Sequence, residues 1–248
     1  MLVMKTKSFL LIFIMALSFD LYALEYKTYL FSDLSKQLGY PSETFFGSTQ
    51  DQINDLESYT SKYDSFYREI NNYLRFYPEP YEWDGTGPAD AKIIVSHMDS
   101  IFKKVPALPK DLILFRGVDL KYRKNKSFSI GEEFLDKGFF STSTSFKVAK
   151  YFAAEMDIEK RTETKKAIYV IYQNQNSPNE KGILIDQNED EVILKHGQVL
   201  KVMAFKKSNT VYETYLIQLC SLKCNLQLNS DVQKFWKRFQ ETSETIIK

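Results

Sequence analysis

The sequence predicts an α+β fold, in which several helices come first and a set of short strands follows. In the N-terminal part of the chain, apolar side chains recur at three- and four-residue spacing, which is typical of amphipathic helices. In the rest of the chain, short apolar runs alternate with polar breaks, which is typical of strands. Because the two kinds of element are not interleaved, the pattern argues against a doubly wound parallel sheet.

Composition limits the classes of protein to which the chain can belong. Of its 248 residues, 44% are hydrophobic and 15% are aromatic, so the chain can bury a substantial core. The 33 Lys and Arg residues balance the 32 Asp and Glu residues, so no strong basic field exists to hold a nucleic-acid backbone. With two Cys and two His, the sequence argues against a structural zinc site and against a disulfide-rich scaffold.

The first 23 residues have the character of a secretory signal peptide. Lys5 and Lys7 precede an apolar run over 9–17, and Ala23 ends the segment on a small residue suited to cleavage. The run is shorter than the roughly 20 residues of a membrane-spanning helix, which favours a cleaved leader over an uncleaved anchor. We therefore expect a signal peptide at 1–23 and one folded domain at 24–248.

Helices are expected in the first part of this domain, where residues that end helices follow the periodic segments. Gly39 ends the first of them, and Pro78 ends the third. The expected helices span 24–38, 51–59, 65–77 and 89–102. In the fourth, the face expected to meet the core consists of Ile93, Ile94, His97, Met98 and Ile101.

Strands are expected at eight short apolar segments in the rest of the domain. A helix at 146–155 interrupts them, and an amphipathic helix at 230–248 closes the chain. We expect the apolar face of this last helix, which includes Trp236, to pack on the domain, and contact with a membrane is the alternative. The expected strands span 112–115, 128–130, 138–142, 167–172, 182–185, 192–194, 199–205 and 211–219.

Cys220 and Cys224 stand close together near the end of the strand region. In an exported protein this spacing allows a short local disulfide, and two idle thiols are the alternative. Neither His97 nor His196 lies near them in sequence, which argues against a catalytic thiol. His97 falls within a helical pattern and His196 precedes Gly197, so both are expected to have structural or surface roles.

Several widespread catalytic motifs are absent. The sequence has neither G-x-x-x-x-G-K-[ST] nor G-x-G-x-x-G, which argues against a P-loop and against a Rossmann nucleotide site. It also lacks H-E-x-x-H and the G-x-S-x-G of hydrolases.

Three segments carry polar residues in patterns that suit chemistry, although each alone also fits an ordinary surface role. The first is the apolar run that ends in Arg116-Gly117, where the Arg fork can hold a phosphate or carboxylate. The second is Ser-Thr-Ser at 141–143, whose hydroxyls can orient a carboxylate or a sugar. In the third, Glu189 and Glu191 are expected on the same side of a strand. Repulsion between the two carboxylates raises the pKa of at least one of them, which suits acid/base catalysis.

In this order the three segments resemble the R-S-E signature of the bacterial mono-ADP-ribosyltransferase toxins, in the branch of C3-like exoenzymes and the enzymatic components of binary toxins. The resemblance extends to the helical region 55–75, to the approach to the Arg over 108–118 and to F-x-x-x-G-F-x-S-T-S over 134–143. It implies a core of two packed, mainly antiparallel β-sheets with N-terminal helices and an NAD cleft between the sheets.

The resemblance further implies an enzyme that splits NAD at the nicotinamide–ribose bond and moves ADP-ribose to a protein side chain without a metal. It gives Glu191 the task of stabilising an oxocarbenium-like transition state, and it gives Ser141 the task of holding Glu191. Arg116 matches the Arg that binds NAD. Glu189 occupies the position that serves arginine acceptors, by engaging the guanidinium and taking its proton.

Other residues would bind the cofactor according to the same resemblance. Gly117 matches the backbone that receives the nicotinamide amide, and Thr142 and Ser143 support the strand of the catalytic Ser. Phe152 stands where the family often has an aromatic over nicotinamide, and a core position in a short helix is the alternative.

Tyr67, Asn71 and Arg75 fall on one helix face at i, i+4 and i+8. The resemblance directs this face toward the adenosine and phosphate end of NAD. The sequence departs from the family pattern at a position that concerns the NAD phosphates. Some relatives have an Arg near the position where this chain has Glu155.

The expected function is that of a secreted, monomeric toxin that transfers ADP-ribose from NAD to arginine on a host protein. A secreted NAD glycohydrolase with water as its main acceptor and a non-enzymatic binding module with the same fold are the alternatives. We expect no stable membrane span and no separate receptor-binding or translocation domain, so that delivery requires another partner.

Overall fold

The chain divides into two compact units in a computed structural model, and residues 28–227 form the unit that holds the strands of the described residues. The second unit contains α7 (Ser230–Ile246), which confirms the predicted closing helix; its Trp236 and Phe239 rings stack with centroids 5.7 Å apart. The predicted leader at 1–23 lies outside the described residues. Those residues are 28–40, 45–61, 66–78, 87–120, 127–155, 166–173, 180–185, 189–207, 212–220 and 230–246.

Four helices begin the larger unit, namely α2 (Phe31–Gln37), α3 (Gln50–Thr60), α4 (Phe66–Phe76) and α5 (Pro88–Lys104). Of the four helices predicted for this region, those at 51–59, 65–77 and 89–102 are confirmed. Thr49 and Gln52 form a capping box at the start of α3, and a Pro opens α5, as the physics of helix ends favours. The predicted start of the first helix is wrong, because Leu30 is extended and the helix begins after it.

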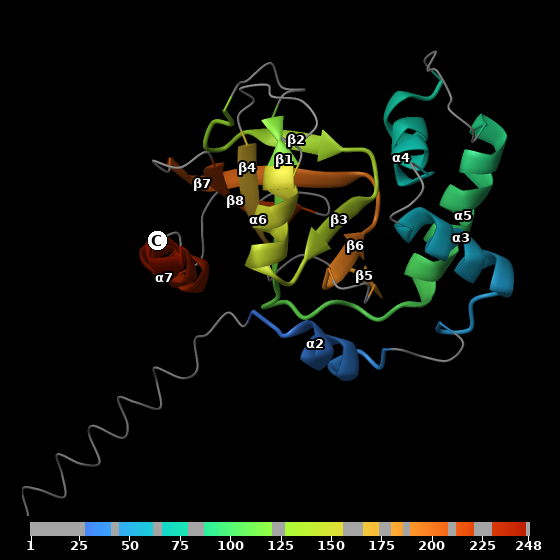
Figure 1. Cartoon of the computed structure of the whole chain (residues 1–248), viewed down its shortest axis with the longest axis horizontal. Coiled ribbons are helices and arrows are strands. Elements are labelled where there is room, and N and C mark those ends of the chain that lie inside the picture. Colours follow the sequence, from blue (N-terminus) through green and yellow to red (C-terminus); the bar gives the residue numbers. More distant parts are fainter. Residues whose placement is uncertain are drawn as a thin grey trace, which may run out of the picture. The chain divides into compact units, whose positions relative to one another are not determined.

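One face of α5 meets the core, although not every residue predicted for it does. Ile94, Met98 and Ile101 are buried, whereas Ile93 is 54% exposed. A helix places neighbours about 100° apart, so Ile93 and Ile94 cannot both face the centre of the same stripe. In Figure 1, α3, α4 and α5 lie together beside the end of the sheet that holds β5 and β6.

Eight strands form one mixed sheet in the order β2-β7-β8-β4-β1-β3-β6-β5, which confirms the α+β class. Every neighbouring pair is antiparallel except β4 and β8. The strands are β1 (Ile113–Asp119), β2 (Glu133–Asp136), β3 (Phe140–Ser143), β4 (Lys166–Gln173), β5 (Gly182–Ile185), β6 (Glu191–Leu194), β7 (Gln198–Lys207) and β8 (Tyr212–Cys220).

The two sheets expected from the sequence are joined at a narrow junction. A five-stranded part, β2-β7-β8-β4-β1, meets a three-stranded part, β3-β6-β5, through a single register pair of Phe115 with Ser143. By contrast, β1 pairs with β4 along its whole length. Beyond Phe115 the β1–β3 ladder is therefore open, and this opening lies in the middle of the sheet.

The predicted strand at 128–130 is wrong. Gly131 has φ +86°, and Glu132 donates its backbone N–H to the Ser129 carbonyl at 3.0 Å, so this segment turns. Phe128 is buried, and its backbone N–H donates to the Tyr215 hydroxyl at 3.2 Å. The Gly131 N–H and the Glu132 carbonyl bond to Val202 of β7, and the paired strand β2 begins after the turn, at Glu133.

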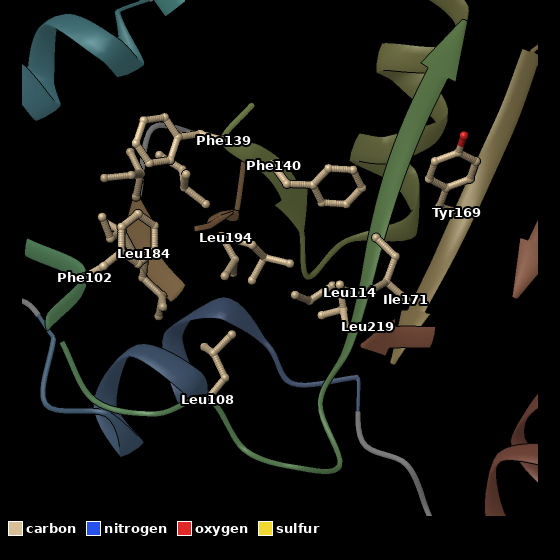
Figure 2. Packing of buried hydrophobic residues seen from close by; sticks show 14 of the residues in the cluster. Phe102, Leu108, Leu114, Phe139, Phe140, Tyr169, Ile171, Leu184, Leu194 and Leu219 are labelled. Atoms are coloured by element: carbon tan, nitrogen blue, oxygen red, sulfur yellow. The ribbon is translucent and has the colours of Figure 1, made fainter. Parts of the chain in front are cut away.

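Two aromatic side chains fix the start of β3 from opposite sides (Figure 2). Phe139 stacks on Phe102 of α5, with centroids 5.9 Å apart, and meets the Tyr59 ring of α3 edge-on at 5.5 Å. Phe140 points the other way, toward β1 (Figure 2). Each is at most 1% exposed, and burial of such a ring contributes about 1.5–3 kcal/mol.

The helix α6 (Phe146–Glu155) packs across β1 and β4, as Figure 1 shows. Its contact with β1 requires a glycine. A Cβ on Gly117 would lie 2.1 Å from the Ala149 carbonyl oxygen and 2.6 Å from the Ala153 nitrogen. The backbone of α6 therefore lies against the strand directly beside Arg116.

Cys220 is disulfide-bonded. Cys224, the partner that the sequence predicts, lies outside the described residues. Within the described ranges, no helix combines the length and the apolar character that crossing a membrane requires.

We predict that Gly117→Ala lowers the free energy of unfolding by about 1–3 kcal/mol, because the methyl group would force α6 away from β1. Gly87→Ala is the control: its Cβ would meet nothing within 4 Å and its φ is −72°. Urea denaturation of both variants measures the difference, and equal losses would contradict the close packing of α6 on β1.

Candidate active site

Arg116, Ser141 and Glu191 come from three strands and form one hydrogen-bonded chain. An Arg116 Nη1–H on β1 donates to the Ser141 carbonyl of β3 at 2.5 Å. The hydroxyl of Ser141 donates to Glu191 Oε1 at 2.5 Å, and Glu191 is the first residue of β6. The structure thus brings together the three residues of the predicted signature.

The open ladder between β1 and β3 explains why the first of these bonds forms. Ser143 still pairs with Phe115, but the next carbonyl on that side of β3, that of Ser141, has no β1 ladder partner. A buried carbonyl without a partner costs free energy comparable to a lost hydrogen bond. The Arg116 guanidinium satisfies it, so the separation of the strands is bridged by a cation.

The Arg116 guanidinium lies over the Phe140 ring, with 4.3 Å from its central carbon to the ring centroid. This arrangement is attractive because the face of an aromatic ring carries partial negative charge. The Nε–H is buried and has no hydrogen-bond partner among the described residues. An unsatisfied buried donor on a cation is costly.

The three hydroxyls that follow Phe140 each have a separate partner. Ser141 holds the Glu191 carboxylate, Thr142 Oγ1 donates to the Val192 carbonyl at 2.6 Å, and Ser143 Oγ donates to the Glu189 carbonyl at 2.8 Å. The register that pairs Ser143 with Glu191 places these partners opposite one another. The hydroxyls of Thr142 and Ser143 are therefore bonded inside the protein.

Glu189 and Glu191 do not lie together on one strand, which corrects the expectation from their spacing. The strand β6 begins at Glu191, and Asp190 before it has φ +48°. This left-handed conformation, which Asp adopts more readily than most residues, turns the chain between the two carboxylates. Thr144 donates its backbone N–H to the Asp190 carbonyl at 3.1 Å, so the turn is fastened to the end of β3.

Tyr59 of α3 lies near this chain and is not among the residues that the motifs predict. Burial raises the pKa of its hydroxyl well above the ordinary value, and the charge of Glu191 raises it further. The hydrogen bond from Asn71 and the charges of Arg116 and Arg75 act in the opposite direction. The phenol therefore stays protonated at neutral pH within electrostatic range of the site. In the sequence it is indistinguishable from any core Tyr on a helix.

Asn71 and Arg75 hold the segment that leads into β3. The Asn71 Oδ1 accepts the Phe139 backbone N–H at 2.7 Å, and its Nδ2 donates to Tyr59 Oη at 3.0 Å. Arg75 Nη2 donates to both oxygens of Asp136, at 3.0 and 3.3 Å. The side-chain amide of Asn71 and the guanidinium of Arg75 are thus engaged within the protein.

The other residues that the sequence assigned to NAD binding lie on α4 and α6. Tyr67 is 39% exposed and its hydroxyl accepts the Nε–H of Arg68 at 2.9 Å. Phe152 is half-buried in α6, with its ring 6.1 Å from that of Tyr151. Glu155 ends this helix.

Both histidines pair with aspartates of the helices. His97 Nδ1 lies 2.5 Å from Asp55 Oδ2, and His196 Nε2 lies 3.2 Å from Asp99 Oδ1. These contacts link α5 to α3 and to the end of β6. In the part of the chain that the structure describes, no group of three or more His, Cys, Asp or Glu residues is placed to hold a metal ion.

Solved structures of bacterial ADP-ribosylating toxins share this fold. The ADP-ribosyltransferase Vis of Vibrio splendidus, solved in complex with agmatine, matches with a TM-score of 0.57 and 20% identity, over 82% of this chain and 87% of that one. Exoenzyme S of Pseudomonas aeruginosa, in complex with human 14-3-3 protein beta and bound to carba-NAD, matches with a TM-score of 0.52 and 16% identity, over 82% and 93%.

A larger protein is also similar. The ADP-ribosylating toxin BECa of C. perfringens, solved with NADH, matches with a TM-score of 0.55 and 16% identity, over 75% of this chain and 48% of that one. At such identities these likenesses show a common fold. No curated protein matches the sequence.

A sequence model of one family matches residues 23–223, described as "ADP-ribosyltransferase exoenzyme". This range contains Arg116, Ser141 and Glu191, and it spans all eight strands. The chain therefore belongs to the ADP-ribosyltransferase exoenzyme family.

Proposed function

We propose that the protein cleaves NAD and transfers ADP-ribose to arginine side chains of a host protein. The observation that carries this proposal is the hydrogen-bonded chain of Arg116, Ser141 and Glu191, with Glu189 two residues away. The NAD analogues bound to exoenzyme S and to BECa support NAD as the co-substrate.

In the proposed reaction Glu191 stabilises the positive charge that develops on the ribose as nicotinamide leaves. A carboxylate is effective in this task only if it is held in place before the reaction. The Ser141 hydroxyl holds one of its oxygens at 2.5 Å. Arg116, whose planar guanidinium fits phosphate oxygens, would bind the NAD phosphates.

Glu189 is proposed to serve the acceptor. The guanidinium of arginine has a pKa above 12, so its attack on the ribose needs a positioned base. Agmatine, bound in the Vis structure, carries the same guanidinium as arginine, which supports this choice of acceptor.

We also propose roles for the remaining candidates, on the basis of the family resemblance. The backbone of Gly117 would receive the nicotinamide amide, and Phe152 of α6 would cover the ring. Tyr67, which is exposed, would contact the adenosine end. Asn71 and Arg75 would act there only by fixing the segment before β3, because their polar groups are engaged within the protein.

We further propose that residues 1–23 form a cleaved leader and that 24–248 form the catalytic part of a secreted, monomeric toxin. The same proposal includes a host protein that is modified on arginine and a partner that delivers the toxin. Mass spectrometry of host-cell proteins incubated with the leaderless protein and NAD tests it. Modified arginines are the expected result, and modification of another residue type alone would contradict the assignment.

We predict that Glu191→Gln lowers nicotinamide release by about 10²–10³-fold, because the amide cannot offset the developing positive charge. The variant keeps an oxygen for the Ser141 hydroxyl, so its thermal unfolding should match that of the wild type. Glu57→Gln, which neutralises an exposed carboxylate on α3, is the control and should keep wild-type activity. If Glu191→Gln retained more than half of the activity, Glu191 would not belong to the mechanism.

We predict that Glu189→Gln separates the two activities. Nicotinamide release without an acceptor depends on Glu191 and should persist, whereas transfer to agmatine should fall by about 10²-fold, the usual contribution of a general base. Parallel assays of nicotinamide release and of label transferred to agmatine give both rates. Equal losses would place Glu189 in the NAD-cleaving apparatus, and high release without any transfer in the wild type would identify a glycohydrolase.

A further inference from the structure

We propose that Ser143 is a positioning residue for Glu189 and thereby sets the share of ADP-ribose that goes to arginine and not to water. This inference rests on the proposed function and extends it to a residue that does not touch the substrate. It divides the two serines of the Ser-Thr-Ser segment between the two carboxylates. Ser141 serves Glu191, and Ser143 serves Glu189.

The contacts of the Ser143 hydroxyl fix its orientation. Its oxygen accepts the backbone N–H of Ser145 at 3.0 Å, so its hydrogen is left for the Glu189 carbonyl at 2.8 Å. The side chain is nearly inaccessible, because Ser143 is only 4% exposed. Water therefore cannot readily take the place of the bond to Glu189.

A second bond fastens the same turn to the end of β3. The backbone N–H of Thr144 donates to the Asp190 carbonyl at 3.1 Å. Two consecutive carbonyls, those of Glu189 and Asp190, thus accept from Ser143, the last residue of β3, and from Thr144, which follows it. Together with the left-handed Asp190, at φ +48°, these bonds fix both peptide planes that follow the Glu189 Cα.

Thr142 provides an internal comparison. Its hydroxyl also donates to a backbone carbonyl, but that carbonyl belongs to Val192, on the other side of Glu191. The two residues are equally buried, at 4% exposure each. Loss of the Thr142 hydroxyl would therefore disturb β6 after the catalytic carboxylate, whereas loss of the Ser143 hydroxyl would disturb the turn before it.

The consequence differs for the two reactions. NAD cleavage uses Glu191, which remains held by Ser141 and by the β3–β6 ladder. Transfer also needs Glu189 within hydrogen-bond reach of the attacking guanidinium, and a small misplacement of such a group is costly. A looser turn therefore lowers transfer more than it lowers hydrolysis.

The experiment measures one ratio, the rate of label transfer from NAD to agmatine divided by the rate of nicotinamide release without acceptor. For Ser143→Ala this ratio should fall by about five- to a hundredfold. For the matched control Thr142→Val it should stay within about twofold of the wild-type ratio, because any loss there acts on both rates. Thermal unfolding of each variant reports separately that it has folded.

A second pair of variants tests the same turn through its backbone, at a half-buried position. Asp190→Val places a β-branched residue at a positive φ, which is strained, and should lower the ratio. Asp190→Gly removes the same side chain but adopts this φ freely, and should keep the ratio. Because both variants lack the carboxylate, the difference between them reports the backbone conformation.

The outcomes are distinguishable. If Ser143→Ala and Asp190→Val left the ratio at its wild-type value, whether or not both rates fell together, the positioning role of Ser143 would be overturned. The proposed arginine transferase activity would remain. A wild-type protein that released nicotinamide without modifying agmatine would overturn the proposed function, and the inference about Ser143 with it.

Discussion

The site depends on the opening of the β1–β3 ladder directly after the pair of Phe115 and Ser143. A continuous ladder would have paired the Ser141 carbonyl with backbone, and Arg116 would have no structural reason to cross to β3. Because the ladder opens, the guanidinium replaces a backbone donor and stacks on Phe140. The cation that we propose to bind NAD is thus held in the middle of the sheet, where the backbone hydrogen bonds of the ladder are interrupted.

Packing on both sides keeps this opening in place. The backbone of α6 lies against Gly117, so β1 is fixed immediately beyond Arg116. On the other side, Asn71 of α4 accepts a hydrogen bond from the backbone of the segment before β3, and aromatic rings of α3 and α5 pack against Phe139. The helices that precede the sheet in sequence therefore act as a support for β3, and through it for Glu191.

Sequence reasoning reached the polar residues of the site more accurately than their geometry. The order of Arg116, Ser141 and Glu191 in the sequence predicted that the three residues form one site, because it matches the R-S-E signature of a single family. The expectation that Glu189 and Glu191 share one strand was wrong, because the positive φ of Asp190 leaves no periodic pattern in the sequence. Sequence reasoning also missed Tyr59 and assigned Asn71 to the ligand, because burial and partners at long sequence separation become visible only in the folded chain.

The central claim is that the Arg116 guanidinium, held between Phe140 and the Ser141 carbonyl, is a binding site for NAD. Calorimetric titration with a non-hydrolysable NAD analogue tests it most directly, with wild type compared to Arg116→Lys. The Lys variant keeps the positive charge but loses the planar fork, so we expect binding to weaken by about tenfold or more. Equal affinity of the two proteins would contradict the claim.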